Sequence, residues 1–307
     1  MLGIGGGGDV IGALAAGRRC ELLGTPFCLG GVAWERFARD PRPGPRPLDE
    51  ISGGARLGDH AVLADPDTAT LDGVLFSEAH ACTYLRRTGS GDQRTVLIDV
   101  TAGAPGAAEG IAAAAAELDC DLVVLVDIGG DAIAAGFEPG LQSPLCDSIM
   151  LGAALRDDPA FDATGVVLGA GCDGELEPGE VLDRVAAIGR AGAWTGTWSV
   201  SAADADEIEA AARDSGTEAS VQVVRCARGE VGESPIRGGR RSVPLGPLGA
   251  LAFCFDPGAA APELPMALAV RDSRSLEAAR AALEALGIRT ELDYERERAG
   301  GGGGTDQ

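Results

Sequence analysis

The stretch TVLIDVTAGAPGAAEGIAAAAAELDCDLVVLVDIGGD, residues 95–131, decides the fold class. It contains two short apolar runs, 95–99 and 122–127, and an alanine-rich segment, 106–118, separates them. Strands that are apolar on both faces and joined by a helix are typical of parallel sheets covered by helices. The stretch therefore predicts a β-α-β unit.

The rest of the chain repeats this alternation. Further strands are predicted at 26–29, 61–63, 73–76, 165–168, 220–224, 250–255 and 267–270, and a short first strand ends at residues 2–4. Further helices are predicted at 9–23, 144–155, 178–191, 202–215 and 275–286. This order predicts an α/β, Rossmann-like, doubly wound fold, in which a mostly parallel sheet carries helices on both faces.

The pattern also predicts the domain organisation. We expect a single α/β domain over residues 1–298, whose part after about residue 199 is the least well defined by the pattern. The last residues, 299–307, read AGGGGGTDQ and predict a disordered tail.

Composition narrows the partners and the chemistry. The 307 residues carry a formal net charge of −22 at pH 7, which disfavours nucleic acid and anionic membrane surfaces, so we expect neither as a partner. The sequence contains no lysine, which excludes Schiff-base catalysis by a protein amine. The eight cysteines form no C-x-x-C pair, so we expect thiols in a reducing compartment and a cytoplasmic location.

Four consecutive glycines, Gly5, Gly6, Gly7 and Gly8, precede Asp9 at the predicted start of the first helix. Free amides at a helix N-terminus favour anions, so these glycines are candidate phosphate ligands. Asp9 would repel a phosphate unless a metal ion lay between them, so it is a candidate ligand of that ion or of a sugar hydroxyl. The alternative is structural: the glycines make a tight turn, and Asp9 caps the helix.

Acidic residues follow two of the predicted strands. Asp127 ends one strand, Asp131 follows the turn made by Gly129 and Gly130, and Asp173 follows a later strand. Ligands of open α/β sheets bind outside the carboxyl ends of the strands, so the three acids are candidate catalytic residues and the two glycines candidate ligand contacts. Paired carboxylates suit Mg²⁺, which makes Asp127 and Asp131 predicted metal ligands. The same acids equally suit sugar hydroxyls or capping.

The helix predicted at 144–155 adds two further residues. Ser143 precedes Pro144 and is predicted as the N-cap of this helix. Asp147 lies one turn into the helix, on the side of the sheet that Asp131 is expected to face.

Two further segments offer candidate chemistry. Glu78 and His80 follow the predicted strand 73–76, and a carboxylate beside an imidazole supplies an acid and a base, so both are candidate catalytic residues. A structural role for the histidine is the alternative. Arg237 lies in an arginine- and glycine-rich segment and is a candidate phosphate ligand, against the alternative of a solvated loop that pairs with surface acids. Arg36 is a further arginine that follows a predicted strand.

Several segments together carry a family resemblance. They are LGIGGGGDVIGA, GGVAWER with PGPR, DIGGDAIAAGFEPGLQSPLCDSIML, GAGCDGELEPGEVLDRV and the closing TELDYER, and they span nearly the whole chain. The set resembles the DUF1152 family, proteins of unknown function from archaea and some bacteria. The resemblance implies an α/β fold and transfers no catalytic role.

Together these features predict an enzyme that hydrolyses or transfers a group on a nucleotide, a nucleoside or a phosphorylated sugar. We expect the phosphate on the glycine loop, and Mg²⁺ or sugar hydroxyls on the carboxylates. A redox cofactor such as NAD(P) ranks lower, because the acid expected about 20 residues beyond the glycine fingerprint is missing. The alternative is a non-catalytic sensor or binding protein. The expected partner is a small, phosphorylated molecule, and a homo-oligomer is compatible with the sequence.

Overall fold

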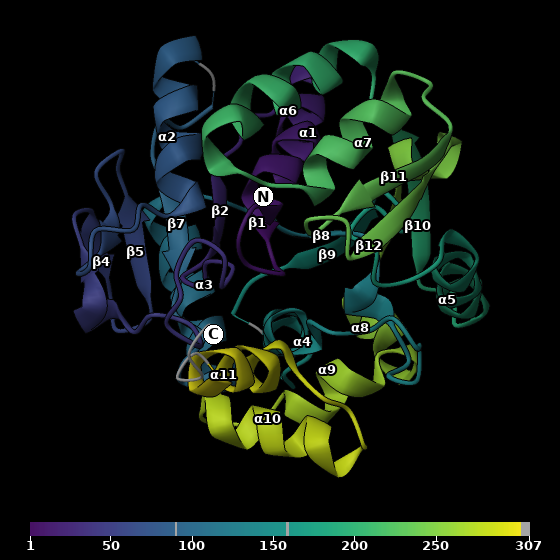
Figure 1. The fold of residues 1–307 in the computed structure, drawn as a ribbon. Helices are drawn as coiled ribbons and strands as arrows, with labels where there is room; N and C mark the ends of the chain where they lie inside the picture. Colours follow the sequence, from purple (N-terminus) through teal and green to yellow (C-terminus); the bar gives the residue numbers. More distant parts are fainter. Residues whose placement is uncertain (90, 158–159, 302–307) are drawn as a thin grey trace, which may run out of the picture.

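The computed structural model describes residues 1–89, 91–157 and 160–301. In these residues nine strands form one mixed sheet: β1 (Leu2–Gly3), β2 (Leu29–Val32), β4 (Ala55–Leu57), β5 (Ala61–Ala64), β7 (Thr95–Ile98), β8 (Val123–Ile128), β9 (Ala163–Leu168), β10 (Trp194–Ser199) and β13 (Leu251–Phe255). Their order is β10-β13-β9-β8-β1-β2-β7-β5-β4 (Figure 1). The five central strands, from β9 to β7, are parallel, and antiparallel strands extend both edges.

Two small sheets lie outside the main one. The first pairs β3 (Ile51–Ser52) with β6 (Ala69–Thr70). The second is a hairpin of β11 (Gly232–Ile236) and β12 (Arg241–Leu245). The hairpin turn carries Arg237.

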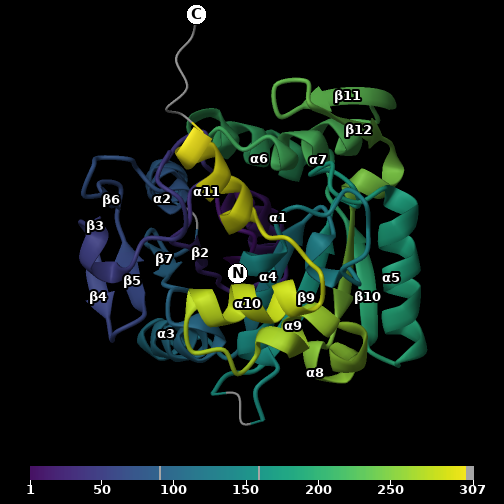
Figure 2. The same ribbon diagram turned by 60° about the horizontal axis from the view of Figure 1, so that its bottom comes forward.

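Helices cover both faces of the main sheet (Figures 1 and 2). One face carries α1 (Asp9–Leu22), α2 (Ser77–Thr88), α6 (Ala202–Ser215) and α7 (Ala219–Ala227). The other face carries α3 (Gly103–Glu117), α4 (Pro144–Ala154), α5 (Pro178–Arg190), α8 (Pro257–Ala260), α9 (Pro265–Val270), α10 (Leu276–Ala285) and α11 (Glu291–Gly301). The expectation of an α/β, Rossmann-like fold is confirmed.

The strand order fixes where a site can form. The chain passes from β7 through α3 to β8, which lies on the far side of β1, so the direction of strand addition reverses between β1 and β8. Leu2 of β1 pairs with Gly30 on one side and with Leu125 of β8 on the other. The loops that follow β1 and β8 diverge at such a reversal, and ligands of open α/β sheets bind there.

Several element predictions were wrong. Residues 220–224 and 267–270 were predicted as strands but lie in α7 and α9. A short apolar run fits either period, and in α7 the buried residues recur at helical spacing. Residues 73–76 form only one isolated bridge, between Leu75 and Ala69, and the strand predicted at 26–29 is displaced to β2. The pattern also missed β10, a largely exposed edge strand without an apolar run.

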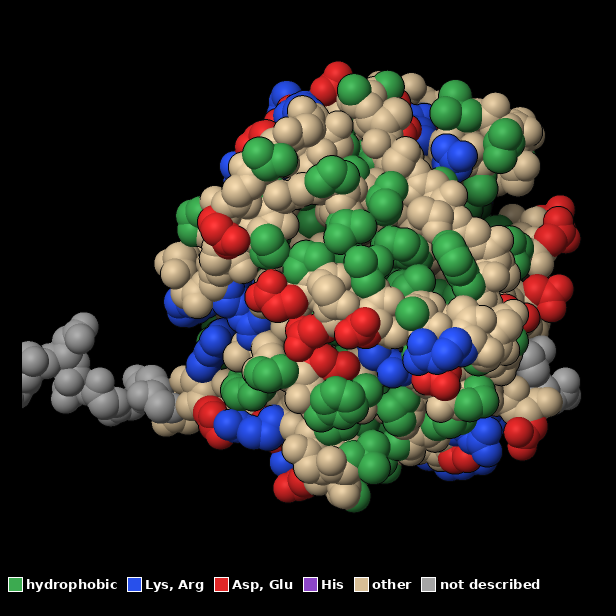
Figure 3. Space-filling view, turned by 90° about the vertical axis from the view of Figure 1, so that its right-hand side faces the viewer, with side chains coloured by type: hydrophobic (Ala, Val, Ile, Leu, Met, Phe, Trp, Pro, Cys, Tyr) green, Lys and Arg blue, Asp and Glu red, His purple; other side chains and the backbone are tan. Residues whose placement is uncertain are grey.

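The chain ends and the sheet edge complete the fold. Helix α11 extends to Gly301, so it overlaps the start of the predicted tail, and residues 302–307 lie outside the described residues. Hydrophobic side chains gather in the centre of the face on the side of α5 and β10 (Figure 3). Trp194, the first residue of β10, is 51% exposed. The homo-oligomer stays a prediction.

No helix in the described ranges is long and apolar enough to cross a membrane.

Candidate functional site

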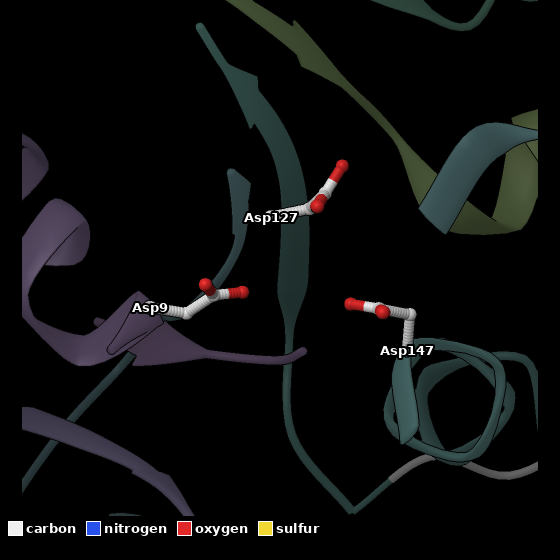
Figure 4. Close-up of side chains that lie close together, drawn as sticks. All are labelled: Asp9, Asp127 and Asp147. Carbon is white, nitrogen blue, oxygen red and sulfur yellow. The ribbon is translucent and has the colours of Figure 1, made fainter. Parts of the chain in front are cut away.

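Three aspartates from three elements meet where the strand order reverses. Asp9 is the first residue of α1, Asp127 lies near the carboxyl end of β8, and Asp147 lies in the first turn of α4. One carboxylate oxygen of each lies within 4.8 Å of the others, and Figure 4 shows Asp9 and Asp147 pointing toward each other with Asp127 beside them. We call them the aspartate trio. The sequence predicted Asp9 and Asp127 as ligands and noted Asp147 without a role.

The trio is buried without full hydrogen bonding. The exposed fractions of Asp9, Asp127 and Asp147 are 7%, 2% and 1%. Asp9 accepts the Gly5 amide at 3.0 Å. Among the described residues, one oxygen of Asp127 and both oxygens of Asp147 have no hydrogen-bond partner. An unpaired buried carboxylate is costly, so the trio requires protons or a cation.

The electrostatics of the trio follow from this burial. Burial raises the pKa of Asp9 to about 6, although the charge of Arg36 and the hydrogen bond from Gly5 oppose the rise. Burial, followed by repulsion from neighbouring acids, raises the pKa of Asp127 and of Asp147 well above the ordinary value.

A second acidic group, Asp131, Asp173 and Glu175, lies beside the trio, with one oxygen of each within 4.8 Å of the others. This group is held by hydrogen bonds. The Ser143 hydroxyl lies 3.2 Å from Asp131 Oδ2 and 2.5 Å from Glu175 Oε1. The amides of Gln142 and Ser143 donate to Glu175 Oε2 at 2.7 and 2.9 Å. Burial, followed by the charge of Glu175, raises the pKa of Asp173 to about 7.

The N-terminus of α4 is held by Glu291 of α11. The Glu291 carboxylate accepts the amides of Leu145 and Cys146 at 3.0 and 2.8 Å. Ser143 precedes the helix as predicted, but its side chain accepts no amide of this helix. Glu291, whose pKa burial raises to about 7, therefore positions the turn that carries Asp147. Sequence reasoning missed it, although it lies in the quoted motif TELDYER.

The turn after β8 depends on Gly129 and Gly130. Their φ angles are 126° and 115°. A Cβ at Gly129 would lie 2.2 Å from Asp173 Cγ, so only glycine lets the Asp173 loop pack on this turn. The two glycines thus shape the turn that brings the carboxylates together. Ligand contact by their backbone stays a prediction.

Backbone conformation and close packing account for the four glycines in the loop between β1 and α1. Gly6 and Gly7 have φ angles of 73° and 58°, and a Cβ at Gly8 would lie 2.1 Å from Thr217 Cβ. The Gly5 amide donates to Asp9, and the Gly7 amide donates to the backbone oxygen of Trp34 at 2.8 Å. Two of the four predicted phosphate-binding amides are therefore engaged within the chain. The prediction of phosphate contact narrows to Gly6 and Gly8.

Two arginines face the acidic centre. Arg36 follows β2, and its side chain lies against Gly7, where a Cβ would lie 2.8 Å from Arg36 Cγ. Burial lowers the pKa of Arg36, but the charges of the surrounding carboxylates, with Asp9 the largest, outweigh it and raise the pKa. Burial, followed by the charge of Arg36, lowers the pKa of Arg237. The predicted Arg237 thus lies within electrostatic reach of Arg36, to which the sequence had assigned no role.

Glu78 and His80 lie in the first turns of α2 and belong to neither acidic group. They form a neighbouring cluster with Glu35 and Arg39. Arg39 Nη2 lies 2.9 Å from His80 Nε2, and Arg39 Nη1 lies 3.4 Å from Glu35 Oε2. Burial, followed by the charge of Glu35, raises the pKa of Glu78 well above the ordinary value. Catalysis by Glu78 and His80 stays a prediction.

Strand order and geometry together define the class: an α/β, Rossmann-like protein with a buried acidic centre between β1 and β8. The family described as "Protein of unknown function (DUF1152)" matches residues 1–299, and the chain belongs to this family. The resemblance seen in the sequence is thereby confirmed. No curated protein and no solved structure matches the chain. The function has to be argued from the site.

Proposed function

We propose that this protein is an enzyme that binds a divalent cation, Mg²⁺ by preference, on the aspartate trio. It uses the cation to hydrolyse or transfer a group on a nucleotide, a nucleoside or a phosphorylated sugar. One observation carries the proposal: the unpartnered, buried oxygens of Asp127 and Asp147 converge with Asp9. Carboxylate oxygens are the ligands that Mg²⁺ prefers in proteins.

The spacing of the trio fits such an ion. Oxygens bound to Mg²⁺ at about 2.1 Å lie about 3 Å apart when adjacent and about 4.2 Å apart when opposite. The three aspartate oxygens lie within 4.8 Å of one another, so small side-chain rotations complete this geometry. Asp131 lies close enough to Asp127 for their charges to interact and would orient it from outside, as groups behind metal ligands commonly do.

The second acidic group supplies the proton chemistry. A bound cation lowers the pKa of its water and polarises a substrate oxygen. Asp173, with a pKa of about 7, is suited to take up and return a proton near neutral pH. Asp127 thus keeps the metal-ligand role that the sequence predicted, and Asp173 keeps the catalytic one. Asp147 joins as a ligand, and Asp131 moves from a predicted metal ligand to a residue that orients Asp127.

The alternatives are separated by particular observations. A non-catalytic sensor would bind the same cation and ligand without turnover. NAD(P) ranks lower because, in the described part of the chain, no free acid follows the second strand to bind its ribose. Strand β2 ends at Val32, and the next acid, Glu35, already accepts the Ser77 amide at 2.5 Å and pairs with Arg39. All eight cysteines are free thiols, which supports the proposed cytoplasmic setting.

Cation titration of chelator-treated protein tests the proposal. Mg²⁺ or Mn²⁺ at about 100 times its Kd should stabilise the fold by about 2.7 kcal/mol, as measured by chemical unfolding. Asp147→Asn should remove this gain. The matched control is Asp99→Asn, because Asp99 is equally buried but accepts Thr101 Oγ1 and the Thr101 and Leu48 amides.

The control should retain the cation response. An unresponsive wild-type protein would refute the proposal. Turnover of one class in a panel of nucleotides, nucleosides and sugar phosphates, lost in Asp147→Asn, would establish the enzyme. Cation and ligand binding without turnover would establish the sensor.

A further inference from the structure

The Arg36 guanidinium has no direct partner although acids surround it. Within residues 1–89, 91–157 and 160–301 it forms no hydrogen bond and no ion pair within 4.0 Å. Arg46, by contrast, lies 2.6 Å from Asp40 Oδ2. A guanidinium carries five N–H donors in a rigid fork that matches carboxylate and phosphate oxygens. The half-buried Arg36 therefore presents unused donors at the edge of the acidic centre.

Arg237 is held in an unusual conformation beside it. Its φ angle is 54°, a left-handed value that is uncommon outside glycine. Its amide is fixed by Glu218, whose two carboxylate oxygens accept it at 3.1 and 3.0 Å. The closest approach of the Arg237 guanidinium to Glu218 is 4.0 Å. The backbone is thus fixed at the hairpin turn while most of the guanidinium donors stay available.

The charges of the two arginines act on each other. The charge of Arg36 acts on Arg237, so two positive groups lie close together, and among the described residues the shortest ion pair of either guanidinium is the 4.0 Å contact of Arg237 with Glu218. Within the same residues, the carboxylates of the acidic centre, such as Glu175, act on the two guanidinium groups by charge without a hydrogen bond to either. An oxyanion that accepts from both guanidinium groups would remove their repulsion, and charge-assisted bonds of this kind are among the strongest hydrogen bonds.

The glycine loop explains how Arg36 reaches this place. The aliphatic part of the Arg36 side chain packs against Gly7, and a Cβ at this position would collide with it. The glycine loop therefore leaves the space that the Arg36 side chain occupies. Asp9 follows the same loop and belongs to the trio, so an anion on Arg36 also faces the proposed cation. This arrangement is typical of phosphate sites, where a cation and arginines neutralise opposite sides of the group.

We infer that Arg36 and Arg237 together bind the phosphate group of the substrate, on the side opposite the cation of the aspartate trio. The substrate is then a phosphate ester, such as a nucleotide or a sugar phosphate, and an unphosphorylated nucleoside is excluded. This inference rests on the proposed function for the cation and adds to it the class of substrate. It also moves the phosphate from the glycine amides to the two guanidinium groups.

Calorimetric titration with inorganic phosphate tests the inference, with the full chain in saturating Mg²⁺. Arg36→Gln and Arg237→Gln should each weaken phosphate binding at least tenfold, and both variants should still bind Mg²⁺. The matched control is Arg240→Gln, because Arg240 lies in the same turn but is exposed. Arg240→Gln should bind phosphate like the wild type. If Arg36→Gln does not fold, Arg36→Lys should still weaken binding, because lysine lacks the forked donors.

The outcomes separate the inference from the proposed function. Undetectable phosphate binding by the wild type, or an equal loss in all three glutamine variants, would overturn the inference. Mg²⁺ binding that depends on Asp147 would meanwhile leave the proposed cation site standing. Phosphate binding that depends on Arg36 and Arg237 without any Mg²⁺ binding would support the arginine site and overturn the proposed function.

Discussion

Replacing Asp9 by asparagine should stabilise the cation-free protein at neutral pH. The Asp9 carboxyl is buried, and its pKa rises from an ordinary value of 3.8 to about 6. Folding therefore favours the protonated acid, and ionisation of Asp9 at higher pH opposes folding. Asparagine has nearly the same shape, carries no charge and can still accept the Gly5 amide that bonds to Asp9 Oδ2.

The size and pH dependence of the effect follow from linkage. A pKa difference of one corresponds to about 1.4 kcal/mol, so ionised Asp9 lowers the free energy of unfolding by about 3 kcal/mol at pH 7. Because the folded-state pKa is the higher one, the stabilising contribution of Asp9 is complete below about pH 4 and is lost as the pH rises through about 6. Asp9→Asn should gain up to about 3 kcal/mol at pH 7, about 5 °C in Tm, and almost nothing at pH 4.

Urea unfolding at pH 4 and pH 7, in the presence of a chelator, measures both values. Asp99→Asn is the control and should destabilise the fold at both pH values, because the Asp99 carboxylate accepts in-chain hydrogen bonds. Saturating Mg²⁺ should cancel or reverse the advantage of Asp9→Asn, since only the wild type keeps the complete trio. An Asp9→Asn variant that is less stable than the wild type at pH 7 without cation would refute this reasoning.

Three further predictions follow from the same geometry. Affinity for Mn²⁺, measured by calorimetry, should rise between pH 5 and pH 7 as Asp9 and its neighbours lose protons, and a flat profile would contradict the carboxylate site. Gly6→Ala should destabilise the fold by about 1–3 kcal/mol, because φ is 73° and a Cβ would lie 2.7 Å from a backbone oxygen. Gly179→Ala, which meets nothing within 4 Å, should be neutral or stabilising, and similar losses in both variants would count against the argument. Glu78→Gln should raise stability at pH 7, since its buried carboxyl has one unpartnered oxygen, and should leave Mg²⁺ affinity unchanged; weaker Mg²⁺ binding would place Glu78 in the site.

The sequence predicts those parts of the fold whose patterns are local. The apolar run of β8 and the alanine-rich α3 give strong periodic signals, and both were found within a few residues. Short apolar runs such as 267–270 fit a strand or a helix equally well, and tertiary packing made this one helical. Strand β10 carries polar and aromatic residues at an edge, so no apolar run marked it.

The residues of the site likewise fall into those that a local sequence pattern predicts and those that only tertiary packing brings there. Asp127 and Asp173 could be predicted because acids after strands share one edge of the sheet, and the structure brings them together. Asp147 and Glu291 reach that place through α4 and α11, whose positions depend on helix packing and not on any local pattern. Glu78 was placed after a strand of the sheet, but that segment forms only a single bridge, and Glu78 lies on α2 instead.

The contrast between the two acidic groups carries the strongest argument for an external ligand. Both are buried and both crowd three carboxylates together, so burial alone cannot distinguish them. Glu175 accepts backbone amides and the Ser143 hydroxyl, and Asp131 Oδ2 lies within hydrogen-bond distance of that hydroxyl, whereas neither oxygen of Asp147 has a hydrogen-bond partner among the described residues. Native proteins satisfy nearly all buried polar groups, and the same loops that supply donors to Glu175 supply none to Asp147. Protons or a cation from outside the chain would offset this burial, and three converging carboxylates favour the cation, which is the basis of the proposed function.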